Sequence, residues 1–223
     1  MAKKFVLNKG LILGAFALVC TGLVTLTFAL TKDTIQAQQV AKVTSIINQI
    51  VPNTLYDNDM THNCAIATAD PLLGKSANHK VYRGFLDNTP SVLAIESMTS
   101  DGYSGNIYFI VGVKFNGTVT GVRVLEHKET PGLGDKIDIR ISDWITTFKG
   151  TELTDNNQAQ WAVRKDGGQF DQFTGATITP RAVVEGVKST LEYVNKNKDR
   201  LFNAEATCQL GNETTEDEET SDE

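Results

Sequence analysis

The longest apolar run of the chain lies near its N-terminus, where residues 10–30 contain no charged side chain. At about 1.5 Å per helical residue, this run reaches about 31 Å, enough to cross the hydrocarbon core of a bilayer. A cleaved signal peptide is the alternative, but its apolar region is normally about 7–15 residues long. We therefore predict an uncleaved single-pass anchor, which covers residues 1–31 together with the short N-terminus before it.

A second helix is predicted directly after the anchor. Apolar side chains recur at roughly helical spacing between Thr34 and Ile50, and Pro52 and Asn53 end the run. We expect this connecting segment to lie within residues 32–54. The domain that follows is then expected to cover residues 55–208, a length that suits one domain with its own core.

Three stretches in the middle of the chain carry the apolar and β-branched residues typical of strands. They are residues 92–98, 106–115 and 118–126. Asn116-Gly117 separates the last two and is a strong signal for a tight hairpin. The pattern therefore predicts an antiparallel meander.

The C-terminal part of the domain is predicted to be mixed. Residues 137–149 place five apolar side chains on one side of a helix, and residues 158–163 could form another strand. A final helix is expected from Pro180 to Lys196, with Thr179 as its N-cap. Its buried positions are Val183, Val187, Leu191 and Val194. The predicted fold class is α+β: a single-pass N-terminal helix, then one domain with an antiparallel sheet and flanking helices.

The charges flanking the apolar run predict its orientation. Lys3, Lys4 and Lys9 precede the run, whereas only Lys32, next to Asp33, closely follows it. The positive-inside rule then places the N-terminus in the cytoplasm, so the domain is expected on the opposite side of the membrane, in the periplasm.

The last fifteen residues, 209–223, differ in composition from the rest. They carry seven acidic side chains and no basic one, so the formal net charge of the chain changes from −6 to +1 without them. Such a tail cannot bury apolar surface and is predicted to be disordered. Because the chain shows no basic patch interleaved with aromatic residues, nucleic acid is not expected as a partner.

The cysteines leave one question open. Cys20 lies inside the apolar run, and Cys64 and Cys208 are the only two in the predicted domain. These two could form a disulfide or remain buried thiols, because pairing depends on a distance that the sequence does not give. The cysteines and histidines show no metal-ligand spacing, so no zinc or iron–sulfur site is predicted.

The segment Phe170–Arg181, FDQFTGATITPR, is the first candidate for chemistry. Its core, Thr174 to Thr177, comes directly before a predicted helix start. Unsatisfied N–H groups and the positive end of the helix dipole would favour an anion near the Thr177 hydroxyl. Taken alone, the segment could also be an ordinary turn.

Two further segments carry glycine-bearing turns. In HKETPGLGDKI, residues 127–137, the turn around Pro131 would let the backbone approach a flat ring closely, with Leu133 packed on the face of that ring. In DGYSGNI, residues 101–107, a turn opens a strand, and Tyr103 is expected to be half-buried. Either segment could instead be a simple loop.

Taken together, the three segments resemble the G subunit of the Rnf (also Rsx) electron transport complex. TGAT with Asp171 upstream resembles D-x-x-[ST]-G-A-T, the site at which bacterial flavin transferases attach FMN to threonine through a phosphoester. The related C subunit of the sodium-pumping NADH:quinone reductase carries similar motifs. The resemblance runs from the anchor to the helix after Thr177.

The resemblance implies a cofactor, a set of site residues and partners. The cofactor would be FMN, bound covalently to Thr177. The other implied site residues are Thr174, Gly175, Ala176, Asp171, Glu129, Thr130, Gly132, Leu133, Gly134, Tyr103 and Ser104. The partners would be the other membrane subunits of an Rnf complex, a flavin transferase during maturation, and the lipid bilayer.

The function that the resemblance implies is electron carriage by the flavin within an ion-translocating complex that links ferredoxin and NAD. An enzymatic role would then belong to the chain as one part of that complex rather than alone. Two alternatives remain at this point. One is an extracytoplasmic ligand-binding or sensing domain without a redox cofactor, and the other is a stand-alone periplasmic flavin reductase.

Overall fold

The structure is a computed structural model that describes residues 2–76 and 78–208. These residues divide into two units, one that ends at Lys42 and one that begins at Val43. The predicted disorder of residues 209–223 lies outside the described residues.

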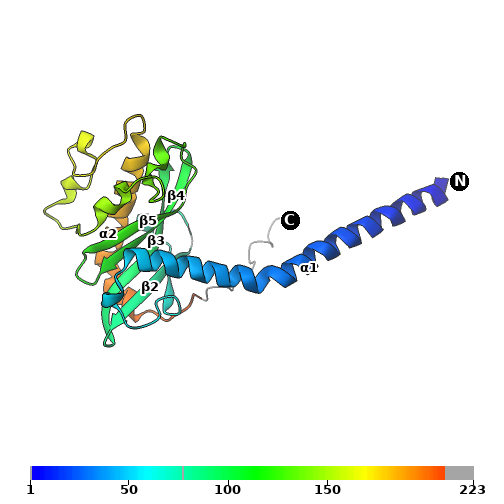
Figure 1. The fold of residues 1–223 in the computed structure, drawn as a ribbon, viewed down its shortest axis with the longest axis horizontal. Coiled ribbons are helices and arrows are strands. Elements are labelled where there is room, and N and C mark those ends of the chain that lie inside the picture. The colour runs from blue at the N-terminus through cyan, green and yellow to red at the C-terminus, as the bar shows by residue number, and fades with distance from the viewer. Residues whose placement is uncertain (1, 77, 209–223) are drawn as a thin grey trace. The chain divides into compact units, whose positions relative to one another are not determined.

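A single helix, α1, runs from Ala2 to Ile50 (Figure 1). Within it, Lys9–Lys32 is long and apolar enough to cross a membrane, and no other helix in the described part of the chain meets that test. The large apolar side chains of this stretch are exposed, for example Leu13 and Leu18. The predicted anchor and the predicted connecting helix are therefore one continuous helix.

The larger unit is built on a five-stranded antiparallel sheet in the order β1-β2-β3-β4-β5. The strands are β1 (Cys64–Ala67), β2 (His79–Leu86), β3 (Thr89–Gly102), β4 (Gly105–Lys114) and β5 (Val119–Glu126). The last three confirm the predicted strands. Their hairpin turns at Asn116-Gly117 as expected, with Gly117 at φ +94° and its N–H bonded to the Lys114 carbonyl at 2.8 Å.

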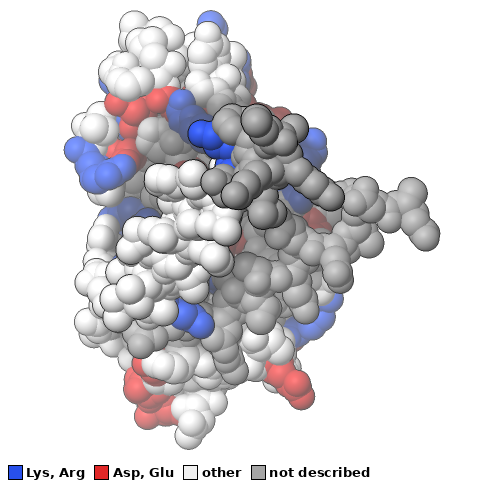
Figure 2. Space-filling model, turned by 90° about the vertical axis from the view of Figure 1, so that its right-hand side faces the viewer, with Lys and Arg blue, Asp and Glu red and all other residues white. Residues whose placement is uncertain are grey.

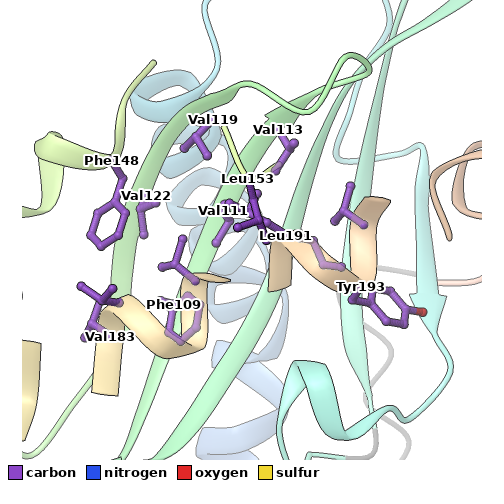
Figure 3. Packing of buried hydrophobic residues seen from close by; sticks show 14 of the residues in the cluster. Phe109, Val111, Val113, Val119, Val122, Phe148, Leu153, Val183, Leu191 and Tyr193 are labelled. Carbon is purple, nitrogen blue, oxygen red and sulfur yellow. The ribbon is translucent and has the colours of Figure 1, made fainter. Parts of the chain in front are cut away.

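Both faces of the sheet are covered. Helix α2 (Ile178–Asn203) packs on one face, where Val183 and Leu191 meet a sheet surface that includes Phe109 and Val111 (Figure 3). The last turns of α1 pack on the other face, where Ile47 and Ile50 belong to a second apolar cluster. Its other members include Val51, Met60, Tyr82, Val92, Ala94 and Ile110. The antiparallel sheet with flanking helices confirms the α+β prediction.

Strands β1 and β2 were not predicted. Four consecutive residues of β2, Val81 to Gly84, are buried, so the strand lacks the alternation of buried and exposed positions that marks a half-exposed strand. β1 pairs only with β2, at the edge of the sheet. A short edge strand next to a strand buried on both faces leaves little periodic signal.

The predicted helix over residues 137–149 is wrong. The structure has two short 3₁₀ turns there, η3 (Gly134–Ile137) and η4 (Trp144–Phe148). Between them the Asp138 carboxylate accepts the Arg140 backbone N–H at 2.9 Å and the Arg140 guanidinium N–H at 3.0 Å, and the Ser142 hydroxyl accepts the Trp144 N–H at 3.0 Å. These local bonds take donors that a helix would use.

Asp138 is held as a charged group in this turn. Its side chain is buried, and the Arg140 hydrogen bond lowers the pKa of the carboxyl below its usual value. His127 lies close by, with Nε2 at 3.8 Å from Asp138 Oδ2. The Nδ1 of His127 in turn accepts the Glu129 backbone N–H at 3.1 Å. His127 therefore connects the start of the loop after β5 to the turn at Asp138.

Two further expectations need correction. Residues 158–163 do not form a strand, because Gln158–Gln160 is a 3₁₀ turn and Val163 makes only an isolated bridge with Phe170. Helix α2 is longer than predicted at both ends, and its N-cap is Thr177 rather than Thr179. The four apolar positions predicted for its buried face are all buried.

Cys64 and Cys208 form a disulfide, with 5.3 Å between their Cα atoms. It joins edge strand β1 to the segment after α2, where the Cys208 N–H also bonds to the Cys64 carbonyl at 3.3 Å. Cys20 is free. On the face of the molecule that Figure 2 shows, basic and acidic side chains lie interspersed.

Candidate functional site

A cleft of about 300 Å³ lies where three segments distant in sequence meet. The segments are the β3–β4 turn, the loop after β5 and the start of α2. The lining residues are Tyr103, Glu129, Thr130, Leu133, Gly134, Gly175, Ala176, Thr177, Ile178 and Thr179. The cleft therefore brings together all three segments that the sequence singled out.

The Glu129 carboxylate joins these three segments. The residue is only 5% exposed, and its Oε1 accepts the backbone N–H of Ser104 in the β3–β4 turn at 3.0 Å. Its Oε2 accepts a hydrogen bond from the hydroxyl of Thr179 in the first turn of α2. Because each oxygen is held by a different segment, Glu129 fixes the walls of the cleft relative to one another.

The loop after β5 closes into a tight turn at Thr130. The Thr130 carbonyl accepts the N–H groups of Leu133 and Gly134, both at 3.1 Å. Gly134 has no room for a side chain, because a Cβ there would lie 2.7 Å from Thr179 Oγ1 and 2.8 Å from Glu129 Oε2. Leu133, which is 42% exposed, presents an apolar surface at the cleft.

The start of α2 leaves one hydroxyl uncommitted. Thr177 is the N-cap, but its side chain makes no capping hydrogen bond. An N-cap hydroxyl normally accepts the N–H of the second or third helical residue. Here the third residue is Pro180, which has no N–H, and the backbone of Thr177 is helical, at φ −87° and ψ −23°, rather than extended as in a usual N-cap. The partly buried Thr177 hydroxyl is thus available at a helix N-terminus inside the cleft.

The segment before this helix is anchored by aromatic packing. The Trp144 ring lies edge-on to Phe173 with 5.1 Å between centroids, and its Nε1–H donates to the Asp171 carbonyl at 2.8 Å. The Asp171 side chain points away from this anchor and pairs with Arg164 at 3.0 Å, and both side chains are more than half exposed. The backbone of the motif is fixed while its acidic side chain stays at the surface.

The structure separates the predicted site residues into two groups. Asp171, Thr174, Gly132 and Ser104 do not line the cleft, although Ser104 reaches it indirectly through its bond to Glu129. The remaining predicted residues do line it. Tyr103 is 68% exposed rather than half-buried, because it sits at the tip of the β3–β4 turn.

Ile178 and Thr179 line the cleft but were not predicted as site residues. Ile178 belongs to no recognisable motif, and Thr179 was assigned to the helix cap. Its contact with Glu129 spans fifty residues of sequence, so no local pattern could have revealed it.

The lining of the cleft carries no basic side chain among the described residues. An anion there would therefore rely on the N-terminus of α2. Among the residues that the structure describes, no three His, Cys, Asp or Glu side chains gather closely enough to hold a metal ion.

Two family models match the chain. The model of the FMN-binding domain matches residues 102–192, which include all three segments of the cleft. The model of the RnfG N-terminal region matches residues 1–50, which is the stretch that ends with α1.

Relatives of known name match nearly the whole chain. The G subunit of the ion-translocating oxidoreductase complex of Vibrio cholerae is 51% identical over 202 residues, which are 91% of this chain and 96% of that protein. The protein of the same name from Pseudoalteromonas atlantica is 47% identical over 206 residues, 92% of this chain and 96% of that protein. Among solved structures, NqrC of Shewanella oneidensis aligns with a TM-score of 0.48 and 24% identity, over 68% of this chain and 74% of that one.

Proposed function

Because the chain belongs to the family of G subunits of ion-translocating oxidoreductase complexes, we propose that it carries electrons through an FMN linked by a phosphoester to Thr177. It is then a membrane flavoprotein subunit of a redox enzyme complex. Its partners in that complex are the other subunits, and its anchor is the apolar part of α1.

The observation that carries the proposal is the state of Thr177. Its hydroxyl makes no capping bond, lies in the cleft and stands at the positive end of α2. A phosphate esterified there gains the free N–H groups and the dipole of the helix without displacing an existing hydrogen bond. Thr174, the other threonine of the motif, is exposed and does not line the cleft.

The walls of the cleft fit the rest of the cofactor. Leu133, Ile178 and Tyr103 offer apolar and aromatic surface for a flat ring, and the Thr130–Gly134 turn brings backbone close to it. Bound FMN would supply the ability to accept and pass on one or two electrons. The protein would position the ring and hold the phosphate.

The exposed residues of the motif have a different role in this proposal. Asp171 and Thr174 lie on the surface beside the cleft, where a flavin transferase can recognise them before attachment. The anchored backbone around Trp144 and Phe173 presents that surface in a fixed conformation.

We place the domain on the periplasmic side of the inner membrane, with the N-terminus in the cytoplasm. The Cys64–Cys208 disulfide supports this orientation, because disulfides persist in oxidising compartments. The lysines before the apolar run support it as well. A covalent link suits that location, since a noncovalent flavin lost there is not readily replaced.

The test of the attachment site is flavin fluorescence on the denatured protein. The chain is produced together with a flavin transferase, as wild type and as Thr177→Ala, Thr177→Ser and Thr174→Ala variants. We expect fluorescence on the wild-type and Thr174→Ala bands, none with Thr177→Ala, and a retained signal with Thr177→Ser. Tryptic peptides of the wild type should show the FMN mass on Thr177.

The other outcomes separate the competing functions. A dark wild-type band from a host with an active transferase contradicts the covalent link, and a colourless native protein then favours a ligand-binding domain. If the purified chain by itself oxidises a nicotinamide and reduces free flavin at a catalytic rate, it is a stand-alone reductase.

A further inference from the structure

A second cleft, of about 380 Å³, lies beside the first and has no role in the proposed function. Its exposed apolar side chains are Ile178 and, in part, Ala162, which lie above buried residues such as Trp161. Its rim carries Asp101, Asp166, Arg181 and Glu185. The rim residues come from the end of β3, the loop before the TGAT motif and the first turns of α2.

The two clefts share their dividing wall. Ile178 lines both clefts and is 45% exposed. Asp101 lines the second cleft, and Tyr103, two residues further on, lines the first. Whatever occupies the second cleft therefore lies one side chain away from the proposed flavin site.

The rim of the second cleft has an unbalanced charge. Arg181 is already paired with Asp166, with 2.7 Å between Nη2 and Oδ1, and Lys165 lies near the same carboxylate without lining the cleft. Asp101 and Glu185 are exposed, and neither has an ion pair within residues 2–76 and 78–208. Two negative charges are thus left at the edge of an apolar hollow.

An apolar centre within a charged rim is the organisation of a protein–protein interface. We propose that this second cleft is the docking site for a segment of another subunit of the complex, one that presents a Lys or Arg side chain next to an apolar residue. The apolar residue packs against Ile178 and Ala162, and the cation pairs with Asp101 or Glu185. Two exposed negative charges at one rim complement a positively charged segment, which is why we commit to a basic one.

This proposal deepens the proposed function, on which it rests. An electron carrier must bring its cofactor close to that of its partner, and the shared wall at Ile178 places the docked segment beside the flavin cleft. The carboxylates would steer the partner and fix its register more than they add affinity.

The direct test is carboxyl chemistry on the intact complex. A water-soluble carbodiimide is applied to the purified complex and to the isolated chain, with glycine ethyl ester as the labelling amine. We expect Asp101 and Glu185 to be labelled in the isolated chain, protected in the complex, and cross-linked there to a lysine of another subunit. Asp155, an exposed acid that lines neither cleft, serves as the control and should be labelled equally in both samples.

A second test uses the variant Asp101→Asn/Glu185→Gln, with Asp155→Asn as its matched control. We expect the double variant to keep its flavin and its fold but to bind the remaining subunits about three- to tenfold more weakly at low salt. The difference should shrink as salt rises, because exposed charges are screened. Asp155→Asn should bind like wild type at every salt concentration.

Three results would overturn the proposal. They are equal labelling of Asp101 and Glu185 in the isolated chain and in the complex, cross-links only to a second copy of this chain, or wild-type binding by the double variant. Flavin on the denatured band is measured in the same samples. A flavin-loaded complex with unprotected carboxylates rejects the docking site alone, whereas a flavin-free complex rejects the proposed function.

Discussion

Glu129 and Thr179 are hydrogen-bonded to each other although fifty residues separate them in sequence. The carboxylate comes from the loop after β5, and the hydroxyl comes from the first turn of α2. Since the other oxygen of Glu129 is held by the Ser104 N–H, one buried side chain connects all three walls of the candidate flavin cleft. The walls of the cleft are therefore joined by the protein's own hydrogen bonds.

Replacing Thr179 by valine should loosen this connection. Valine keeps the shape of the side chain but removes the donor, so one oxygen of the buried Glu129 loses its partner. We expect the free energy of unfolding to fall by about 1–3 kcal/mol. Thr179→Ser keeps the hydroxyl and should cost under about 1 kcal/mol, the value of one buried methyl group. Denaturant unfolding of the full chain in detergent, followed by tryptophan fluorescence, measures both, and equal losses would contradict the role of the hydroxyl.

Gly134→Ala should act on the same contact from the opposite side. The added Cβ would press on both Thr179 Oγ1 and Glu129 Oε2, so the bond between them cannot keep its geometry. We expect Gly134→Ala alone to destabilise the domain by about 1–3 kcal/mol. In the double variant with Thr179→Val, the two losses should not add, since the same interaction is removed twice. Full additivity in this double-mutant cycle would show that the glycine is needed for another reason.

Asp138 gives a pH-dependent prediction. Its pKa in the folded protein lies below the unfolded value of about 3.9, chiefly because the Arg140 side chain donates hydrogen bonds to it. The stability that it contributes is therefore fully present above that unfolded value and is lost as the pH falls through the lower, folded value. Asp138→Asn should lower the free energy of unfolding by about 1–2 kcal/mol at neutral pH.

As the pH is lowered from 7 to 2, the difference in the free energy of unfolding between wild type and Asp138→Asn should narrow once the pH falls below the unfolded pKa of about 3.9. Denaturant unfolding across that range measures it. If the two proteins differ by the same amount at pH 7 and at pH 2, the charge on Asp138 does not support the turn.

Removing the disulfide should destabilise the domain strongly. The bond joins residues 144 apart and ties the segment after α2 to edge strand β1. For such a long loop we expect Cys64→Ser or Cys208→Ser to cost about 2–5 kcal/mol. Cys20→Ser, which removes only a free thiol, should leave the unfolding transition where it is. Thermal unfolding of oxidised and reduced protein gives the comparison, and an unchanged transition on reduction would contradict the prediction.

The strongest predictions from sequence were those that depend on local chemistry. Asn116-Gly117 marked its hairpin because the turn needs a positive φ at Gly117, which glycine adopts without strain. The apolar face of α2 followed from its spacing. Strand β2 was not predicted because it is buried on both faces, so its pattern does not alternate. Strand β1 was not predicted either, because it is a short edge strand.

Local patterns also misled where side chains compete for backbone donors. Residues 137–149 have helical apolar spacing, yet Asp138 and Ser142 bind nearby N–H groups and break the run into short turns, which leaves Ile141 exposed. The motifs of the cleft were visible in sequence, whereas their meeting point was not. That point depends on Glu129 reaching Ser104 and Thr179, two contacts made only after the sheet and α2 have packed.

The last prediction concerns the proline that follows the TGAT motif. Pro180 occupies the third position of α2, from which an ordinary residue would donate its N–H to the N-cap hydroxyl. Pro180→Ala restores that donor. The Thr177 hydroxyl can then cap the helix, and a capping bond worth about 1 kcal/mol should make it about fivefold less available for esterification.

We therefore expect Pro180→Ala to acquire covalent flavin about fivefold more slowly than wild type while its fold is retained. The measurement is the time course of fluorescence on the denatured band during incubation of the purified chain with a flavin transferase and its flavin donor. Pro52→Ala, an exposed proline outside both clefts, is the control and should label at the wild-type rate. Wild-type kinetics in a folded Pro180→Ala protein would mean that the missing N–H does not keep the Thr177 hydroxyl free, and that the cleft exposes it by geometry alone.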